Sequence, residues 1–195
     1  MWSKTSSSNS PIVESKAYRK PEVPREIAAQ IRSYVRIQWP FLDARDGKLW
    51  DVPADSSSRT FVVLDGDKLI SHVEANFRTI EHANQSFTIG GLSAVFTYPA
   101  YRGNGHAAQV VRVATGFLDD NGADLSMLFC GDPLRRFYVS CDWEAVDGAH
   151  ILFGDRAAPT RYEDGIVMMR FTSAKGRAAK LRIAGEPVYV GERTW

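Results

Sequence analysis

The chain has 195 residues, 44% of them hydrophobic and 24% charged, which is typical of a single globular domain with one core. A net charge of +1 gives no electrostatic reason to expect nucleic acid or an anionic membrane as a partner. No apolar run reaches the length of a membrane span, and the N-terminus lacks the apolar region of a secretory signal. The two cysteines, Cys130 and Cys141, form neither a metal motif nor a disulfide framework, so we expect free thiols in a reducing cytoplasm.

The first part of the chain divides into a polar segment and a helix. Residues 1–11 are rich in serine, and we expect residues 1–20 to form a flexible tail and residues 21–195 a single domain. Pro24 and Glu26 open a helical pattern with one apolar face. That face consists of Ile27, Ile31, Tyr34 and Val35. Residues 39–58 combine aromatic and acidic side chains, which is typical either of a binding lid or of a covering loop.

An antiparallel meander of three strands is predicted next. The strands are expected at residues 60–64, 68–80 and 86–97, separated by an Asp-Gly turn at 65–66 and a polar turn at 81–85. Gly90–Gly91 indicates a bulge or a weak point inside the third of these strands.

The second half of the chain alternates helices and strands. An apolar helical face from Ala107 to Leu118 ends at Asn121–Gly122, and a short strand follows at 124–130. Asp132–Pro133 is a typical start for a second helix. Two long strands at 143–153 and 166–171 and a short hairpin within 180–195 complete the expected elements. This order predicts a mixed α+β single domain.

The loop between the meander and the following helix carries two glycines, Gly103 and Gly105. Unpaired N–H groups at a helix N-terminus attract anions, and glycines let a phosphate approach the backbone. Arg102 would add a positive side chain to such a cradle. A plain strand-to-helix turn also favours glycine, so the loop alone leaves both interpretations open.

Two nucleotide-binding motifs fit this loop poorly. Gly103, Gly105 and Ala108 match the G-x-G-x-x-A form of the dinucleotide fingerprint, with Asp124 as a candidate ribose ligand. That fingerprint requires a parallel βαβ unit, whereas three antiparallel strands precede this loop. A Walker A loop is excluded because no Lys-Ser/Thr pair follows the second glycine.

The segment RGNGHA at 102–107 resembles the R-x-x-G-x-A motif of the GNAT acetyltransferases, and DPLRRFYVSCDWEAV resembles their following tyrosine-bearing helix and strand. The resemblance covers roughly residues 25–171. It implies a GNAT-like acyl-CoA N-acyltransferase fold: a mixed central sheet with an antiparallel N-terminal meander, splayed between its fourth and fifth strands, with helices on both faces.

The resemblance also implies acetyl-CoA as co-substrate, with no metal. Its pyrophosphate would bind the N–H groups of the glycine loop, and its pantetheine arm would pair with main chain near Val95 and Thr97, where an N–H group could polarise the thioester. The coenzyme-binding residues expected on this basis are Val95, Phe96, Thr97, Arg102, Gly103, Asn104, Gly105, His106, Ala107 and Ala108.

The catalytic residues that the resemblance implies are Tyr138 and Glu74. Tyr138 matches the tyrosine that protonates the leaving thiolate, although it could equally be a core residue, and Ser140 is a lesser candidate. Residues 87–97 contain no acid to act as base, so Glu74 on the preceding strand is the candidate, with a solvent-facing residue as the alternative. His72 nearby is interpreted as an ordinary sheet histidine.

For the acceptor, the chain is most similar to the aminoglycoside 2′-N-acetyltransferases. In these enzymes acidic groups bind a polycation, and Glu163, Asp164 and the Trp195 carboxylate would correspond, with Ser93 also at the acceptor site. Three features favour a small-molecule primary amine in general over an aminoglycoside as the acceptor. They are Ser93 in place of a glutamate, the positive charge of Arg193 and the near-neutral net charge of the chain. A catalytically weak acyl-CoA-binding module, from a different functional class, remains open. The further expectations are a cytoplasmic protein with a possible homodimer.

Overall fold

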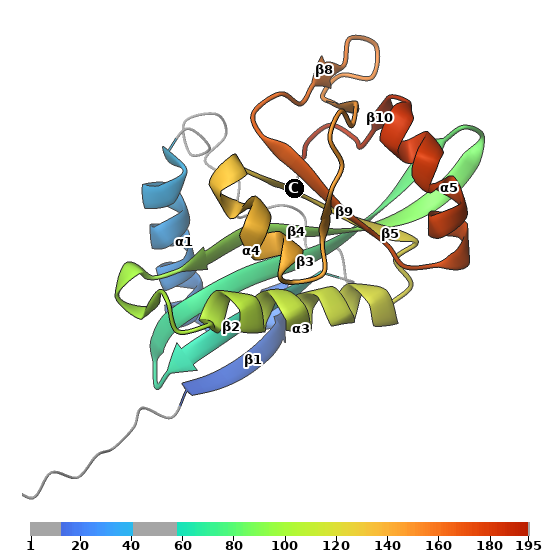
Figure 1. Ribbon diagram of the computed structural model, residues 1–195. Coiled ribbons are helices and arrows are strands. Elements are labelled where there is room, and N and C mark those ends of the chain that lie inside the picture. The colour runs from blue at the N-terminus through green and yellow to red at the C-terminus, as the bar shows by residue number, and fades with distance from the viewer. Residues whose placement is uncertain (1–12, 41–57, 195) are drawn as a thin grey trace, which may run out of the picture.

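The computed structural model describes residues 13–40 and 58–194, and it shows an α+β fold built on a seven-stranded sheet with helices on both faces (Figure 1). The fold class expected from the sequence is therefore confirmed. The elements are β1 (Val13–Arg19), η1 (Lys20–Glu22), α1 (Arg25–Gln38), β2 (Arg59–Asp65), β3 (Lys68–His82), β4 (Gln85–Thr97), η3 (Pro99–Tyr101), α3 (His106–Asp120), β5 (Leu125–Cys130), η4 (Asp132–Leu134), α4 (Arg135–Val139), β6 (Glu144–Ala145), β7 (Ile151–Phe153), β8 (Thr160–Arg161), β9 (Ile166–Phe171), α5 (Ala174–Gly185) and β10 (Val188–Tyr189).

The strand order of the main sheet is β1-β2-β3-β4-β5-β9-β6. Strands β1 to β4 pair with one another in antiparallel fashion, which confirms the expected meander, and β5 then joins β4 in parallel after the α3 crossover. The β3–β4 hairpin turns through Ala83 and Asn84, whose φ angles of 49° and 59° belong to a type I′ turn. Strands β10, β7 and β8 form a second, three-stranded sheet.

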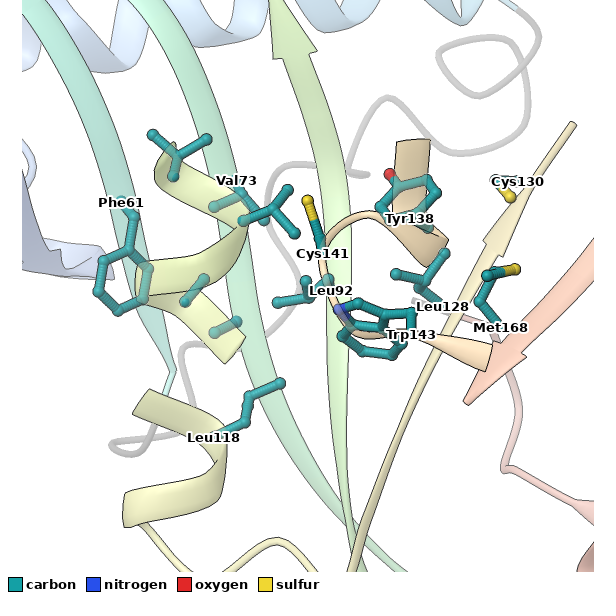
Figure 2. Close-up of a cluster of buried hydrophobic side chains, with 14 of the residues drawn as sticks. Phe61, Val73, Leu92, Leu118, Leu128, Cys130, Tyr138, Cys141, Trp143 and Met168 are labelled. Atoms are coloured by element: carbon teal, nitrogen blue, oxygen red, sulfur yellow. The ribbon is translucent and has the colours of Figure 1, made fainter. Parts of the chain in front are cut away.

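Three buried clusters fill the spaces between the sheet and its helices. The largest lies under α3 and α4 and includes Leu92, Leu128, Tyr138 and Trp143 (Figure 2). On the opposite face, α1 packs its predicted apolar residues Ile27, Ile31 and Tyr34 against β2, β3 and β4. The third cluster joins the far end of the sheet to α5 and the small sheet. None of the helices in residues 13–40 and 58–194 is long and apolar enough to cross a bilayer.

The N-terminal expectation needs a correction. Residues 13–19, assigned to a flexible tail from the sequence, form the edge strand β1, which pairs with β2 along its whole length. Six of the seven residues are exposed, so the alternation of apolar and polar side chains that marks a strand is absent. Residues 1–12 and 41–57 lie outside the described residues, and with them most of the expected lid or covering loop.

The C-terminal third also differs from its expected elements. The long strand predicted at 143–153 is divided into β6 and β7 by a turn containing Gly148, whose φ is 82°. In place of a C-terminal hairpin, residues 174–185 form α5 and residues 188–189 pair with β7 in parallel. Only Gly176 and Ile183 of α5 are buried, so the helix has almost no apolar face for a pattern to detect.

Asp124 fastens α5 to the sheet. Its carboxylate accepts hydrogen bonds from the Thr88 N–H at 3.0 Å, the Ser173 hydroxyl at 2.8 Å and the Lys175 ammonium at 2.7 Å. Its carbonyl oxygen lies where Gly176 passes, and a Cβ on Gly176 would be 1.9 Å from that oxygen. The acid considered as a ribose ligand is therefore a structural anchor.

This close approach predicts the effect of a single methyl group. Gly176→Ala should lower the free energy of unfolding by about 1–3 kcal/mol, because α5 must move away from Asp124 despite alanine's higher helix propensity. The measurement is urea denaturation. The matched control is Gly116→Ala inside α3, where an added Cβ meets nothing within 4 Å. It should be neutral or stabilise the protein by up to about 1 kcal/mol, and similar behaviour of the two variants would contradict the prediction.

Candidate active site

The site is built around the place where β4 and β5 part. Only three residue pairs join the two strands, Ile89–Gly91 with Leu125–Met127. Beyond them β4 continues to Thr97 and β5 to Cys130, but among the described residues each is paired only with its outer neighbour, β3 or β9. The expected splay between the fourth and fifth strands is therefore present, and it leaves the facing edge of β4 open from Leu92 onward.

The open stretch of β4 contains a bulge. Ala94 and Val95 together face the single residue Val73 of β3, between the pairs Glu74–Ser93 and His72–Phe96. Ala94 has a φ of 48°, a left-handed conformation that is uncommon for a residue with a side chain. The bulge was expected at Gly90–Gly91. Gly90 instead allows close packing, because a Cβ there would lie 2.8 Å from the Ser126 hydroxyl.

The register decides which main-chain groups the open edge presents. The Tyr98 N–H bonds the Ile70 carbonyl at 2.9 Å, and antiparallel pairs alternate in their hydrogen bonding, so the main chain of Phe96 also faces β3. Val95 and Thr97 then turn their main chain away from β3. Phe96, one of the expected coenzyme residues, is held on the β3 side: its buried ring stacks on Tyr34 with centroids 4.0 Å apart, and its carbonyl accepts the Ser71 hydroxyl.

The glycine loop follows directly and ends in α3. Gly103 and Gly105 have φ angles of 82° and 80°, and an added Cβ at either would meet nothing within 4 Å. Gly105 is the N-cap of α3, where no side chain caps the first turn and the first turn holds no acid. The N–H groups of His106, Ala107 and Ala108 therefore begin a helix whose positive end is open.

Arg102 joins the glycine loop to two neighbouring elements. Its guanidinium donates to the Thr97 carbonyl at 3.0 Å and to the Tyr34 hydroxyl at 2.9 Å, so it ties the glycine loop to the end of β4 and to α1. Asn104 bonds within the loop, to the carbonyls of Tyr101 and Arg102. These contacts hold the shape of the loop.

Tyr138 lies on α4, between β4 and β5 in Figure 2, with its hydroxyl directed away from Leu128 and Trp143. Its side chain belongs to the large cluster, and burial, reinforced by the nearby thiols of Cys130 and Cys141, raises its pKa. Tyr138 therefore keeps its proton throughout the physiological range. Ser140 is exposed, and its hydroxyl bonds the Phe137 carbonyl in its own helical turn.

Glu74 lies on the other face of the sheet and is buried, not solvent-facing as the alternative had it. It stands directly opposite Ser93 of β4 and Thr60 of β2. The Lys20 ammonium is 3.5 Å from Glu74 Oε2, whereas Oε1 has no hydrogen-bond partner among the described residues. Burial raises the pKa of Glu74, and Lys20 opposes part of that rise. Sequence reasoning missed Lys20 because it fell in the presumed tail.

The other acceptor candidates lie apart from Glu74. Ser93 accepts a hydrogen bond from the Asn76 amide at 3.1 Å, beside Glu74. Asp164 is exposed in the turn before β9, next to Tyr162, whose ring packs on Phe129 of β5 at 4.4 Å. Trp195 lies outside the described residues. Within the described ranges, no group of three or more His, Cys, Asp or Glu side chains could hold a metal ion.

Comparison with known proteins supplies the family. The sequence profile described as "Acetyltransferase (GNAT) domain" matches residues 16–146, which run from within β1 through β6 and include the glycine loop. The chain therefore belongs to the GNAT acetyltransferases. This match confirms the family that the sequence resembles. A search of curated proteins gives no match.

Solved structures agree with this fold. A GNAT-family N-acetyltransferase (YhbS) from Escherichia coli in complex with CoA is similar over 91% of this chain and 89% of its own, with a TM-score of 0.57 and 16% identity. An acyl-CoA N-acyltransferase from Pseudomonas aeruginosa is similar over 81% and 99%, with a TM-score of 0.58 and 12% identity. The chain spans about a third (32%) of a conserved Enterococcus faecalis V583 protein, which covers 68% of this chain with a TM-score of 0.53 and 20% identity.

The Lys20–Glu74 pair predicts a titration that can be measured without a substrate. Lys20→Met should raise the pKa of Glu74 further, because it removes the cation that opposes the effect of burial. The measurement is a ¹³C NMR titration of labelled glutamate carboxyls. The control is Lys16→Met, which removes the exposed β1 lysine paired with Glu14. It should leave the pKa of Glu74 unchanged. An unchanged pKa of Glu74 in Lys20→Met would show that the Lys20–Glu74 pair does not form in solution.

Proposed function

We propose that this protein transfers an acetyl group from acetyl-CoA directly to a primary amine of a small molecule. The observation that carries the proposal is the continuity of two features: the open edge of β4 leads straight into an uncapped helix N-terminus carrying two glycines of positive φ. Together they offer a main-chain edge for an extended arm and an anion cradle at its end. Acyl-CoA has that shape and that charge distribution.

The donor would bind mainly through backbone groups. Its pyrophosphate would lie on the N–H groups of the glycine loop and the first turn of α3, where glycine leaves room for it. Its pantetheine amides would pair with Val95 and Thr97, although the Thr97 carbonyl already accepts Arg102. We therefore expect Val95 to carry most of the pairing nearest the thioester.

The reaction would be one direct displacement. A neutral amine attacks the thioester carbonyl carbon, the carbonyl oxygen becomes an oxyanion near the Val95 N–H, and the C–S bond then breaks to release CoA thiolate. The raised pKa of Tyr138 lies above that of an ordinary thiol, so a complete proton transfer from Tyr138 to the thiolate would be uphill. Tyr138 would instead stabilise the thiolate as a hydrogen-bond donor.

Glu74 is the proposed base. It faces Ser93 across the β3–β4 ladder, at the position where an acid on β4 itself is absent. Its raised pKa makes the carboxylate a stronger proton acceptor than an exposed glutamate. It would take the proton that the amine loses, directly or through a water molecule. Lys20 opposes the rise in the pKa of Glu74 and so favours the ionised carboxylate that accepts the proton.

We infer the chemical class of the acceptor from the charged groups near the site. A buried carboxylate beside Ser93 and Asn76 suits a single primary amine on a polar molecule. Aminoglycosides remain a specific hypothesis, supported by the exposed Asp164 and by the sequence resemblance. Lys20, whose charge offsets that of Glu74, weakens the case for a polycation. An acyl-CoA-binding module is the second candidate, because β4 lacks any acid.

The test is thiol release from acetyl-CoA across a panel of primary amines that includes amino sugars, polyamines and aminoglycosides. Release with one of these amines would support the proposed transfer. Thermal stabilisation by acetyl-CoA without turnover on any amine would favour the binding module. No stabilisation at all would overturn both candidates.

The glycine cradle predicts a selective loss of coenzyme binding. Gly105→Leu should raise the acetyl-CoA dissociation constant by about 100-fold or more, because two or more charge-assisted hydrogen bonds of roughly 1.5–3 kcal/mol each would be blocked. Isothermal titration calorimetry measures this.

The chain offers a matched control at the other end of α3. Gly122 has a φ of 86°, and its added Cβ also meets nothing within 4 Å, so Gly122→Leu imposes similar backbone strain away from the cradle. Both variants should lose roughly 1–2 kcal/mol of stability, but Gly122→Leu should bind acetyl-CoA like the original protein. Equal binding by the two variants would mean that the cradle assignment is wrong.

The role of Glu74 predicts a pH dependence. The carboxyl must lose its proton to act as base, so kcat/KM should rise with pH through a midpoint above the ordinary glutamate range, as the raised pKa requires. Glu74→Gln should abolish that acidic limb and lower kcat/KM by about 100-fold or more. Glu81→Gln, at an exposed position on the same strand, is the control. An unchanged pH profile in Glu74→Gln would assign the base elsewhere.

A further inference from the structure

His72 is the buried histidine of β3 nearest the open edge. Its side chain has no exposed surface, and its ring stacks on Phe96 with centroids 5.0 Å apart. Its Nδ1 lies 2.8 Å from the Ala94 carbonyl oxygen. Because a carbonyl can only accept, Nδ1 carries the hydrogen and donates it. Burial lowers the pKa of His72 to about 4, so the ring is neutral and this tautomer is fixed under physiological conditions.

The acceptor of this hydrogen bond is an unusual residue. Ala94 occupies the bulge of β4 with a φ of 48°, a conformation that residues with a Cβ rarely adopt. The bulge places Ala94 and Val95 opposite one residue of β3, so the normal ladder does not fix the peptide between them. The His72 side chain supplies a contact that does.

That contact also sets the direction of the next N–H group. In a planar trans peptide the C=O and the N–H point in opposite directions. With the Ala94 carbonyl held on His72, the Val95 N–H is directed away from His72. The Val95 side chain packs into the cluster under α3 and α4, which also contains Tyr138. The Ala94 carbonyl therefore faces His72 on β3, and the Val95 N–H faces away from β3, toward the open edge of β4.

We propose that His72 is a positioning residue, which holds the Ala94–Val95 peptide so that the Val95 N–H meets the thioester carbonyl. The inference rests on the proposed function for the identity of that carbonyl. His72 touches neither coenzyme nor acceptor in this arrangement. Its effect passes through one main-chain peptide, so the position of the donor atom matters more than the presence of an imidazole.

Three substitutions of His72 distinguish the position of its hydrogen-bond donor from the size of its side chain. Asparagine places an amide N–H close to the position of Nδ1, whereas glutamine places it farther out and leucine has no donor. We therefore expect His72→Asn to retain the function, and His72→Gln and His72→Leu to lose it. If His72→Leu does not fold, the comparison between asparagine and glutamine still decides. His82→Leu, at the buried histidine on the far end of β3, is the control for loss of a buried imidazole.

The first measurement reads the thioester directly. Acetyl-CoA labelled with ¹³C at the acetyl carbonyl should show a downfield shift on binding, because a hydrogen bond polarises the carbonyl. This shift should be lost in His72→Gln and His72→Leu. It should be kept in His72→Asn and in the control variant, His82→Leu. With an accepted amine, kcat should fall by about 10- to 100-fold in the first two variants. The KM for acetyl-CoA should stay within about threefold, because the glycine cradle is untouched.

The second measurement needs no ligand, so it separates this inference from the proposed function. NMR couplings that report the φ angle of Ala94 should change in His72→Gln and His72→Leu and stay unchanged in His72→Asn. An Ala94 backbone that is the same in all variants would overturn the inference, whether or not acetyl-CoA binds. A carbonyl shift that persists in His72→Gln and His72→Leu would overturn it and leave the proposed function standing.

Discussion

The end of the ladder between β4 and β5 is the constraint on which the site depends. Two neighbouring parallel strands normally satisfy each other along their length, but here the pairing stops after Gly91 and Met127. From that point β4 must find other partners for its main chain or present it to a ligand. The bulge, the glycine loop and the first turn of α3 follow in that order along one continuous stretch of chain. The geometry of the site is therefore mainly a geometry of backbone groups.

The side chains around this backbone have mostly supporting roles. Arg102 holds the loop to the end of β4, and Phe96 fixes the strand to α1 through stacking with Tyr34. Buried groups with displaced pKa values lie on the two faces of the sheet, Tyr138 on one and Glu74 on the other. A proton donor that keeps its proton and a carboxylate that readily accepts one are thus separated by the sheet itself.

The sequence predicts the parts of this arrangement that have local signals. The glycines of the loop, the α1 face of Ile27 and Ile31, and the meander each follow from spacing or from turn chemistry. The bulge could not be located in this way, because Ala94 has no sequence mark and its conformation depends on register and on His72. The partner of Glu74 was missed for a similar reason. Lys20 precedes Glu74 by 54 positions in the sequence. The two meet only because the exposed strand β1, which has no apolar pattern, joins the sheet.

Strand β1 has one more consequence, which concerns the exposed edge of the sheet. β1 bears charged Glu14 and Lys16 at the rim of the sheet, where they discourage pairing with another chain. Behind it, β2 is a run of five buried residues from Thr60 to Leu64, with high β-propensity and no charge. A shortened protein that began after Lys20 would expose the edge of that run to solvent. Such a protein would keep the whole glycine loop and yet be prone to associate strand to strand, so β1 serves as the cover of the sheet edge.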